Sequence, residues 1–213
     1  MTVTIVSLAA RGEGEISVSF EIRSGEHCQR EQFLITAALC ADLHLCVGEC
    51  GTDCYDAVSR GAELCSAVKR GLYLLGYGSC SERTLQRKLM MKGFSAEISA
   101  EAVRELCRRG YLDAESDAKR EAERCVAKLW GTRRIVATLY QKGYPQEAVK
   151  AAIHFLEDEG VDYVDLCAER IRRKEGSVPG DPDTRRRLTA SLERNGFSFS
   201  EIREAFARVA QEE

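Results

Sequence analysis

LMMKGF, residues 89 to 94, occurs in this sequence in two further versions, LYQKGY at 139 to 144 and LERNGF at 192 to 197. In each version a glycine stands four positions after a leucine, and an aromatic residue follows the glycine. A glycine just past the last turn of a helix can adopt the left-handed backbone conformation that stops the helix. The aromatic residue can then fold back on the helix it has left. We therefore predict three helices that end in the same way, one in each of three related units.

A helical pattern of apolar residues extends from about residue 56 to near the end of the chain. The apolar residues recur at i, i+3, i+4 and i+7, and they predict nine helices in three groups of three. The third helices share one register, except that Ser99 stands in the first group where Val149 and Ile202 stand in the others. The predicted ranges are 62–75, 82–92 and 98–109; 116–130, 132–142 and 146–159; 162–175, 182–195 and 200–210.

The beginning of the chain predicts strands instead of helices. TVTIVSL (2–8) and EISVSFEI (15–22) alternate in polarity and are rich in β-branched residues, which is typical of half-buried strands. ARGEGE (10–15) lies between them and favours a turn. EQFLIT (31–36) suits either a third strand or the first turn of the helix that follows. The chain therefore begins with a small β-rich head.

Units of about 50 residues that share one apolar pattern stack against one another, because each buries its apolar face on its neighbours. We predict a mainly α protein with tandem three-helix repeats in an elongated array and a small β-rich N-terminal head. The alternative is a helical bundle in which the similarity of the segments is incidental. The predicted segments are 1–60 for the head with its cysteine-rich stretch, and 61–110, 111–160 and 161–213 for the three repeats.

Charge is distributed unevenly along the chain. The net charge is −3, but residues 67–142 hold 16 Lys and Arg against 9 Asp and Glu, a net of +7. The segments before and after this basic middle carry −6 and −4. Such a distribution favours an anionic partner for the middle of the chain, or acidic flanks that shield it.

The composition predicts a cytoplasmic protein with no membrane partner. No apolar run approaches the roughly 18 residues that a membrane-spanning helix requires. The start of the chain lacks the basic and apolar regions of a signal peptide. Ten cysteines are present, and cytoplasmic thiols are normally reduced. Cys107, Cys125 and Cys167 occupy helical apolar positions, where free cysteine behaves as a small apolar residue.

We predict no catalytic residues, no cofactor and no metal. His27, His44 and His154 stand in no metal-binding or catalytic motif, and no phosphate loop or nucleophile elbow occurs. The stretch CADLHLCVGECGTDC (40–54) lacks the two separated cysteine pairs typical of structural zinc. A metal or redox sensor built on this stretch stays open as an alternative. Its candidate ligands would be Cys40, His44, Cys46, Cys50 and Cys54.

Basic residues on the outer faces of predicted helices are the candidates for contact with a partner. Arg120, Arg124 and Arg134 lie away from the apolar stripes of their helices, so we expect the reversal of these three to glutamate to weaken binding and leave the fold intact. Asp117, Glu121 and Glu123 partly neutralise this face, and an ordinary solvated surface is the alternative. The seven candidates are Arg83, Arg87, Arg120, Arg124, Lys128, Arg133 and Arg134.

Three stretches together resemble the RecX regulatory proteins of bacteria. They are S-x-x-x-L-x-x-K-L-x-x-K-G-F at 81–94, G-Y-L-D at 110–113 and G-x-x-x-I-x-x-x-L-x-x-K-G at 131–143. The resemblance extends from about residue 67 to residue 206. It implies tandem three-helix repeats as the body of the fold and an N-terminal head that varies among members. This chain departs from the family at GYGSCS (76–81), where arginines usually precede the serine.

The resemblance also implies a partner and a function. RecX proteins bind the nucleoprotein filament of the RecA recombinase and restrain its recombinase, ATPase and co-protease activities in DNA repair and the SOS response. We expect this chain to act in the same way as a monomer, with direct contact to DNA as a further option. The alternative is a helical-repeat DNA-binding module. Its recognition helices would have to be the third helices, whose starts are acidic or apolar and suit base reading poorly.

Overall fold

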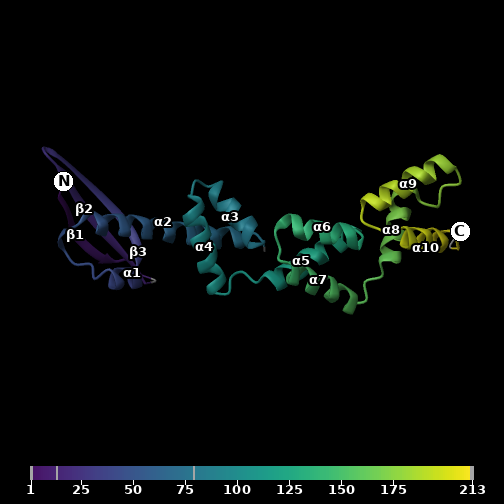
Figure 1. Cartoon of the computed structure of the whole chain (residues 1–213), viewed down its shortest axis with the longest axis horizontal. Helices are drawn as coiled ribbons and strands as arrows, with labels where there is room; N and C mark the ends of the chain where they lie inside the picture. Colours follow the sequence, from purple (N-terminus) through teal and green to yellow (C-terminus); the bar gives the residue numbers. More distant parts are fainter. Residues whose placement is uncertain (1, 13, 79, 212–213) are drawn as a thin grey trace. The chain divides into compact units, whose positions relative to one another are not determined.

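The computed structural model describes residues 2–12, 14–78 and 80–211. Within these ranges it contains four strands and ten helices (Figure 1). One helix, α1, lies between the third and fourth strands, and the other nine follow the fourth strand. The mainly α fold with three-helix repeats and a small β-rich head is confirmed. Glu13 of the predicted turn and Ser79 of GYGSCS lie outside the described residues, as do the outermost positions of the first and last predicted segments.

The chain divides into two compact units. One is formed by Met1–Tyr77 with Leu85–Tyr111, and the other by Gly78–Thr84 with Leu112–Glu213. The predicted segment boundaries at residues 60, 110 and 160 stay a prediction. One helix, α2 (Thr52–Leu75), runs without a break through the first of these boundaries. In the ranges that the structure describes, no helix combines the length and the apolar character needed to cross a bilayer.

The head is a four-stranded antiparallel sheet in the order β3-β2-β1-β4. Both predicted strands are confirmed, and EQFLIT belongs to a strand rather than to a helix. The reason is pairing along its whole length, since β3 forms a hairpin with β2 in which Glu15 pairs with Thr36 and Ser24 pairs with His27. The strands are β1 (Thr2–Ala10), β2 (Glu15–Ser24), β3 (His27–Thr36) and β4 (Gly48–Cys50).

The first half of α2 packs against the sheet and shares its core. Val58 of α2 is buried with apolar residues of β1, β2 and β3. Tyr55 packs edge-on against Phe20 and Phe33, with ring centroids 5.3 and 5.5 Å apart. The helix starts at Thr52, ten residues before the predicted start at residue 62. The prediction missed these ten residues because Gly61 interrupts the apolar pattern. A side chain at Gly61 would meet Leu39 of the short, unpredicted helix α1 (Ala37–Asp42), at 2.1 Å.

Eight further helices follow, and they agree with the predicted ranges to within two residues at all ends but one. The exception is α5, which ends at Val126 rather than at residue 130, because Leu129 adopts a left-handed backbone with φ 56°. Ser99 is fully buried in the core of its repeat, and its hydroxyl has no hydrogen-bond partner among the described residues. The helices are α3 (Glu82–Met90), α4 (Ala96–Arg108), α5 (Ala114–Val126), α6 (Thr132–Lys142), α7 (Gln146–Asp158), α8 (Tyr163–Glu175), α9 (Pro182–Arg194) and α10 (Phe199–Gln211).

The three glycine loops close α3, α6 and α9 in the same way. Gly93, Gly143 and Gly196 have φ values of 96°, 85° and 94°, so the predicted left-handed conformation is confirmed at each. The glycine N–H donates to the carbonyl three residues earlier at 2.9 to 3.0 Å. The N–H of the aromatic residue donates to the leucine carbonyl five residues earlier at 3.2 to 3.4 Å. This pair of bonds satisfies carbonyls that the end of a helix otherwise leaves unpaired.

The loop at Gly143 also holds the start of α3. Ser81 and Thr84 both donate their hydroxyl groups to the carbonyl of Lys142, the second at 3.2 Å. The methylene groups of Arg83 lie against Gly143 so closely that a Cβ there would be 2.6 Å from Arg83 Cδ. Glycine is therefore required here for its missing side chain as well as for its backbone conformation.

The loop at Gly196 holds the start of α6 in the same manner. Gly131 donates its N–H to the carbonyl of Asn195 at 2.8 Å, and Arg133 donates its N–H to the carbonyl of Gly196 at 3.2 Å. A Cβ on Gly196 would lie 2.3 Å from the backbone nitrogen of Arg134. We call α3, α6 and α9, the second helices of the three repeats, the middle helices. We call each of these contacts a repeat joint: the first turn of a middle helix lies on the glycine loop that ends the middle helix of the following repeat. Both joints lie within the second compact unit.

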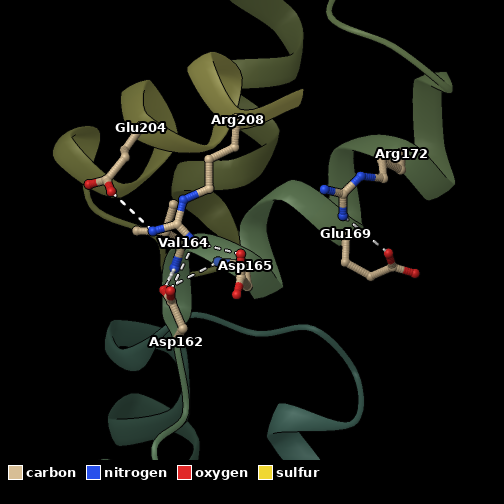
Figure 2. A network of polar contacts seen from close by, with 7 residues as sticks. All are labelled: Asp162, Val164, Asp165, Glu169, Arg172, Glu204 and Arg208. Atoms are coloured by element: carbon tan, nitrogen blue, oxygen red, sulfur yellow. Dashed lines mark hydrogen bonds and ion pairs between the residues drawn. The ribbon is translucent and has the colours of Figure 1, made fainter. Parts of the chain in front are cut away.

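A network of charges closes the third repeat (Figure 2). Asp162 caps α8 by accepting the N–H groups of Val164 and Asp165 at 2.8 and 3.3 Å. Arg208 of α10 donates to Asp162 at 2.9 Å, to Asp165 at 2.5 Å and to Glu204 at 3.1 Å. These bonds hold the end of α10 against the start of α8. The hydrogen bond from Arg208 is the main reason that the pKa of Asp162 lies below its ordinary value.

Replacing each loop glycine by alanine separates the two roles of glycine. An alanine at positive φ costs about 1–2 kcal/mol in any of the three loops. Gly143→Ala adds an overlap with a side chain, and Gly196→Ala adds an overlap with backbone atoms that cannot move aside. We expect the free energy of unfolding in urea to fall least for Gly93→Ala and most for Gly196→Ala. Equal losses at the three positions would contradict the repeat joints.

Asp162→Asn keeps the helix cap but removes the charge that Arg208 binds. The folded-state pKa of Asp162 lies below the ordinary value of 3.8. Its ion pair therefore stabilises the fold above about pH 4, and this stabilisation is lost as the pH falls through the folded-state value. We expect the variant to have a lower urea midpoint than the parent at pH 7, with the difference shrinking as the pH falls below about 4 and through the lowered folded-state pKa of Asp162. The control is Asp183→Asn, because the carboxylate of Asp183 makes no ion pair with a described residue. An equal loss of urea midpoint at pH 7 in the two variants would contradict a stabilising role for the ion pair of Asp162.

Candidate functional site

Six of the seven predicted contact residues lie in the second compact unit. Arg87 lies in the first unit, exposed on α3 one turn after Arg83. Arg83 and Arg133 occupy equivalent places at the two repeat joints. Arg83 stands two residues after Ser81, and Arg133 stands two residues after Gly131. The remaining four are Arg120 and Arg124 on α5, Lys128 just after α5, and Arg134 in the first turn of α6.

Two of these arginines neutralise buried carboxylates. Asp117 and Glu121 are each only 5% exposed, so the expectation that they form part of a solvated face is wrong. Arg120 lies 3.7 Å from Asp117, and Arg124 lies 3.4 Å from Glu121. Lys142 completes the pairing of Glu121 at 2.6 Å. Glu121 would keep Lys142 if Arg124 were lost, so each arginine contributes to the neutralisation of a buried carboxylate whatever else it contacts.

Arg134 is a structural residue of the second repeat joint. Its guanidinium group lies 4.0 Å from the ring centroid of Trp130 and donates to the side-chain oxygen of Asn195. Asn195 is 6% exposed. The expectation that reversal of Arg134 leaves the fold intact gains no support from these contacts, because a glutamate would meet the acceptor oxygen of Asn195 inside the joint. The neighbouring Arg133 has an exposed side chain and suits a charge reversal better.

Beside this joint, four cations line a hollow of about 320 Å³. We call it the basic hollow, and its charged residues are Lys128, Arg170, Arg173 and Lys174. Arg173 donates to Glu169 at 2.8 Å, and Lys174 lies 3.7 Å from Glu175. These two charges are thus partly neutralised at the rim.

The inner cations of the basic hollow are held by groups without charge. Arg170 donates to the carbonyls of Lys128 and Leu129 at 3.1 and 3.3 Å. The ammonium group of Lys128 lies 5.0 Å from the ring centroid of Trp130. Burial, and then the charge of Arg134, lowers the pKa of Arg170. Among the residues that the structure describes, no carboxylate pairs with Lys128 or Arg170, so the hollow favours an anion such as a phosphate or a carboxylate.

Sequence reasoning missed three of the four charged residues of the basic hollow. It sought the excess of positive charge in residues 67–142, whereas Arg170, Arg173 and Lys174 lie in the following segment with its net of −4. The backbone of Leu129 brings the two segments together by turning its carbonyl toward Arg170. The signal that could have found them is the run RRK (172–174) at the end of a predicted helix.

The cysteine-rich stretch is distributed over several elements. Cys40 lies in α1, Cys50 in β4 and Cys54 in α2. Burial, and then the neighbouring Cys54, raises the pKa of Cys50 to about 11, which keeps this thiol protonated and a poor ligand near neutral pH. In the described part of the chain, no three His, Cys, Asp or Glu side chains are grouped to hold a metal ion. The sensor alternative gains no support from this geometry.

Three glycine-closed units of three helices, two of them linked through repeat joints to the next, define a tandem helical-repeat protein. No family model matches the chain. It is 30% identical over 154 residues to the regulatory protein RecX of Chlorobaculum tepidum, across 70% of this chain and 91% of the relative. It is 32% identical over 142 residues to the regulatory protein RecX of Pelodictyon phaeoclathratiforme, across 65% and 86%. The chain belongs to the RecX family of regulatory proteins.

Solved structures show the same fold. A crystal structure of regulatory protein RecX matches with a TM-score of 0.72 at 18% identity, over 95% of this chain and 99% of that chain. RecX from Lactobacillus salivarius matches with a TM-score of 0.56 at 16% identity, over 70% and 97%. Because the first match leaves out only a small part of this chain, most of the β-rich head lies within it. The resemblance found in the sequence is therefore confirmed.

Proposed function

We propose that this protein binds the RecA–DNA filament in the cytoplasm and inhibits recombinase, ATPase and co-protease activity in DNA repair and the SOS response. The observation that carries the proposal is family membership, since relatives named regulatory protein RecX match over most of their length. The protein acts as a monomer and through contacts alone, without chemistry of its own.

The basic hollow supports contact with an anionic surface of the filament. Its inner cations have no described carboxylate partner, so an incoming phosphate or carboxylate would not have to displace an existing ion pair. Lys and Arg contacts to phosphates contribute affinity without reading sequence. Such contacts also speed encounter between oppositely charged partners. The hollow therefore suits the DNA backbone or an acidic protein surface in the filament.

Direct DNA binding by this chain is a second candidate, and the same hollow favours it. The helices that would have to read bases argue against sequence-specific binding. The third helices α4, α7 and α10 carry Glu97, Glu147 and Glu201 in their first turns, where a recognition helix contacts base edges. We therefore propose contact with the DNA backbone as part of filament binding rather than as an independent activity.

The first test is ATP hydrolysis by RecA on single-stranded DNA with increasing amounts of this protein. We expect inhibition at near-stoichiometric or lower amounts, because the family resemblance implies binding along the filament rather than consumption of a substrate. An unchanged rate over a wide excess of the protein in low salt would contradict the proposal.

The second test reverses two exposed cations of the basic hollow, Lys128 and Lys174, together with the exposed Arg133 of the adjacent repeat joint. Each exposed charge contributes on the order of 1 kcal/mol or less, so the variant combines Lys128→Glu, Arg133→Glu and Lys174→Glu. We expect inhibition to require about tenfold more protein, and the parent to weaken as salt rises. The control is Lys150→Glu, Arg186→Glu and Arg203→Glu, which makes the same change in net charge at exposed positions elsewhere. Equal behaviour of the two triple variants would show that the hollow is an ordinary solvated surface.

A further inference from the structure

The glycine loop of the first repeat lacks the helix start that the other two loops hold. Gly93 is exposed, and a Cβ built on it would meet no atom within 4 Å. Gly143 and Gly196 would meet atoms at 2.6 and 2.3 Å. The aromatic residues follow the same order, because Tyr144 and Phe197 are 4% and 0% exposed while Phe94 is half-buried. The first loop is thus built like the others but is open.

A hollow of about 500 Å³ lies beside this loop, between the end of α3 and the second half of α2. We call the loop and the hollow together the open socket. Its lining combines cations with aromatic rings, and the guanidinium group of Arg70 lies 5.0 Å from the ring centroid of Tyr73. All of its residues belong to the first compact unit. The residues are Ser66, Lys69, Arg70, Tyr73, Lys92 and Phe94, with Gly93 between the last two.

Large side chains at the end of α3 and at the end of α2, in the same unit as the open socket, face solvent. Met91 is 79% exposed and Met90 is 46% exposed at the end of α3. Tyr73 and Tyr77 are 54% and 76% exposed, with their rings 5.0 Å apart and a hydrogen bond of 2.5 Å between their hydroxyl groups. Tyr73 and Tyr77 thus form one exposed aromatic pair, and exposed apolar groups that lie together mark surfaces that bind other proteins. Methionine in particular adapts its shape to a partner.

The filled loops show what kind of group the open socket accepts. At both repeat joints, donors in the first turn of a helix bind carbonyls at the end of another helix. The carbonyls of Lys92 and Gly93 accept no hydrogen bond from another residue in the described ranges. They lie at the negative end of the dipole of α3, which favours the positive start of an incoming helix. A helix start with free N–H or hydroxyl groups therefore complements this loop.

The charge of the open socket restricts the occupant further. Lys69 is already paired with Glu15 at 2.6 Å. Arg70 and Lys92 make no ion pair with any carboxylate that the structure describes. Two uncompensated cations beside a binding loop favour an acidic side chain on the incoming group. Asp and Glu are also the residues that stabilise the first turn of a helix, so one occupant satisfies both requirements.

A second copy of this chain fits the open socket poorly. The start of α9 is the only middle-helix start that no described glycine loop receives, and it closes on itself. Asp181 accepts the N–H and the hydroxyl of Thr184 at 2.8 and 2.7 Å, and Pro182 has no N–H to donate. At the second joint, by contrast, Gly131 supplies no side-chain cap to α6 and leaves its backbone donors for the loop.

We propose that the open socket binds the first turn of an α-helix of a partner protein, a turn that has free backbone donors and an acidic side chain. This inference rests on the proposed function, because it places a contact with the protein part of the RecA filament on the first repeat. The basic hollow lies in the other compact unit. The two surfaces can therefore be changed separately.

The test compares binding of four forms of the full chain, the parent and three variants, to RecA filaments on single-stranded DNA with a non-hydrolysable ATP analogue. The socket variant is Arg70→Glu with Lys92→Glu. The control is Arg104→Glu with Lys150→Glu, which makes the same charge change at exposed positions outside the socket. We expect the socket variant to bind about tenfold or more weakly than the parent, and the control to bind like the parent. A second variant, Met91→Glu, alters a side chain that makes no core contact and should also weaken binding.

The possible results distinguish the open socket from a different surface and from a different occupant. Parent-like binding by both socket variants would overturn the inference and leave the proposed function standing. No binding by the parent would remove the proposed function, and the inference with it. The same loss of affinity on bare single-stranded DNA would assign the socket to nucleic acid and overturn the inference. So would self-association of the parent in sedimentation that the socket variant abolishes, because the occupant would then be a second copy.

Discussion

The end of a helix leaves carbonyl groups without partners, and the start of a helix leaves N–H groups without partners. In this protein two helix ends solve the problem together, because the start of one middle helix lies on the glycine loop that ends the next. Gly196 makes this contact possible, since any side chain there would overlap backbone atoms of the arriving helix. The remaining features of the second unit depend on this joint. Arg134, Trp130 and Asn195 assemble around it, and the basic hollow forms beside it.

The same contact explains why one sequence element occurs three times with different surroundings. A loop that receives a helix must bury its aromatic residue, and Tyr144 and Phe197 are buried accordingly. A loop that receives nothing keeps the same hydrogen bonds but leaves its aromatic residue and its carbonyls accessible, as at Gly93 and Phe94. Repetition thus produces a free binding surface without any change in local structure.

Much of the fold could be predicted from the sequence because its helices rest on local rules. The i, i+3, i+4 spacing located every repeat helix, and glycine at positions 93, 143 and 196 located three helix ends. EQFLIT could not be assigned, since its conformation depends on pairing with β2, which no local pattern records. The early end of α5 depends on Leu129, a residue type that rarely adopts positive φ, and no sequence signal marks it.

The candidate site could be predicted only in part, because charge in a sequence does not show where a side chain is buried. Arg120 and Arg124 look like free surface charges until Asp117 and Glu121 are found buried beside them. Arg170 lies in a segment of net negative charge, and only the turn at Leu129 brings it to Lys128. Long-range hydrogen bonds decide these positions. The periodicity that predicts helices carries no information about them.

Amide hydrogen exchange of Gly131 and Arg133 tests the repeat joint most directly. Amides in the first turn of a helix have no partner within the helix and ordinarily exchange fast. At the joint these two amides donate to Asn195 and Gly196, so we expect them to exchange as slowly as the amide of Leu139 within α6. The amide of Glu147, at the start of α7 where Pro145 provides no side-chain cap, should exchange fast. Exchange of Gly131 and Arg133 as fast as that of Glu147 would contradict the joint on which the second unit depends.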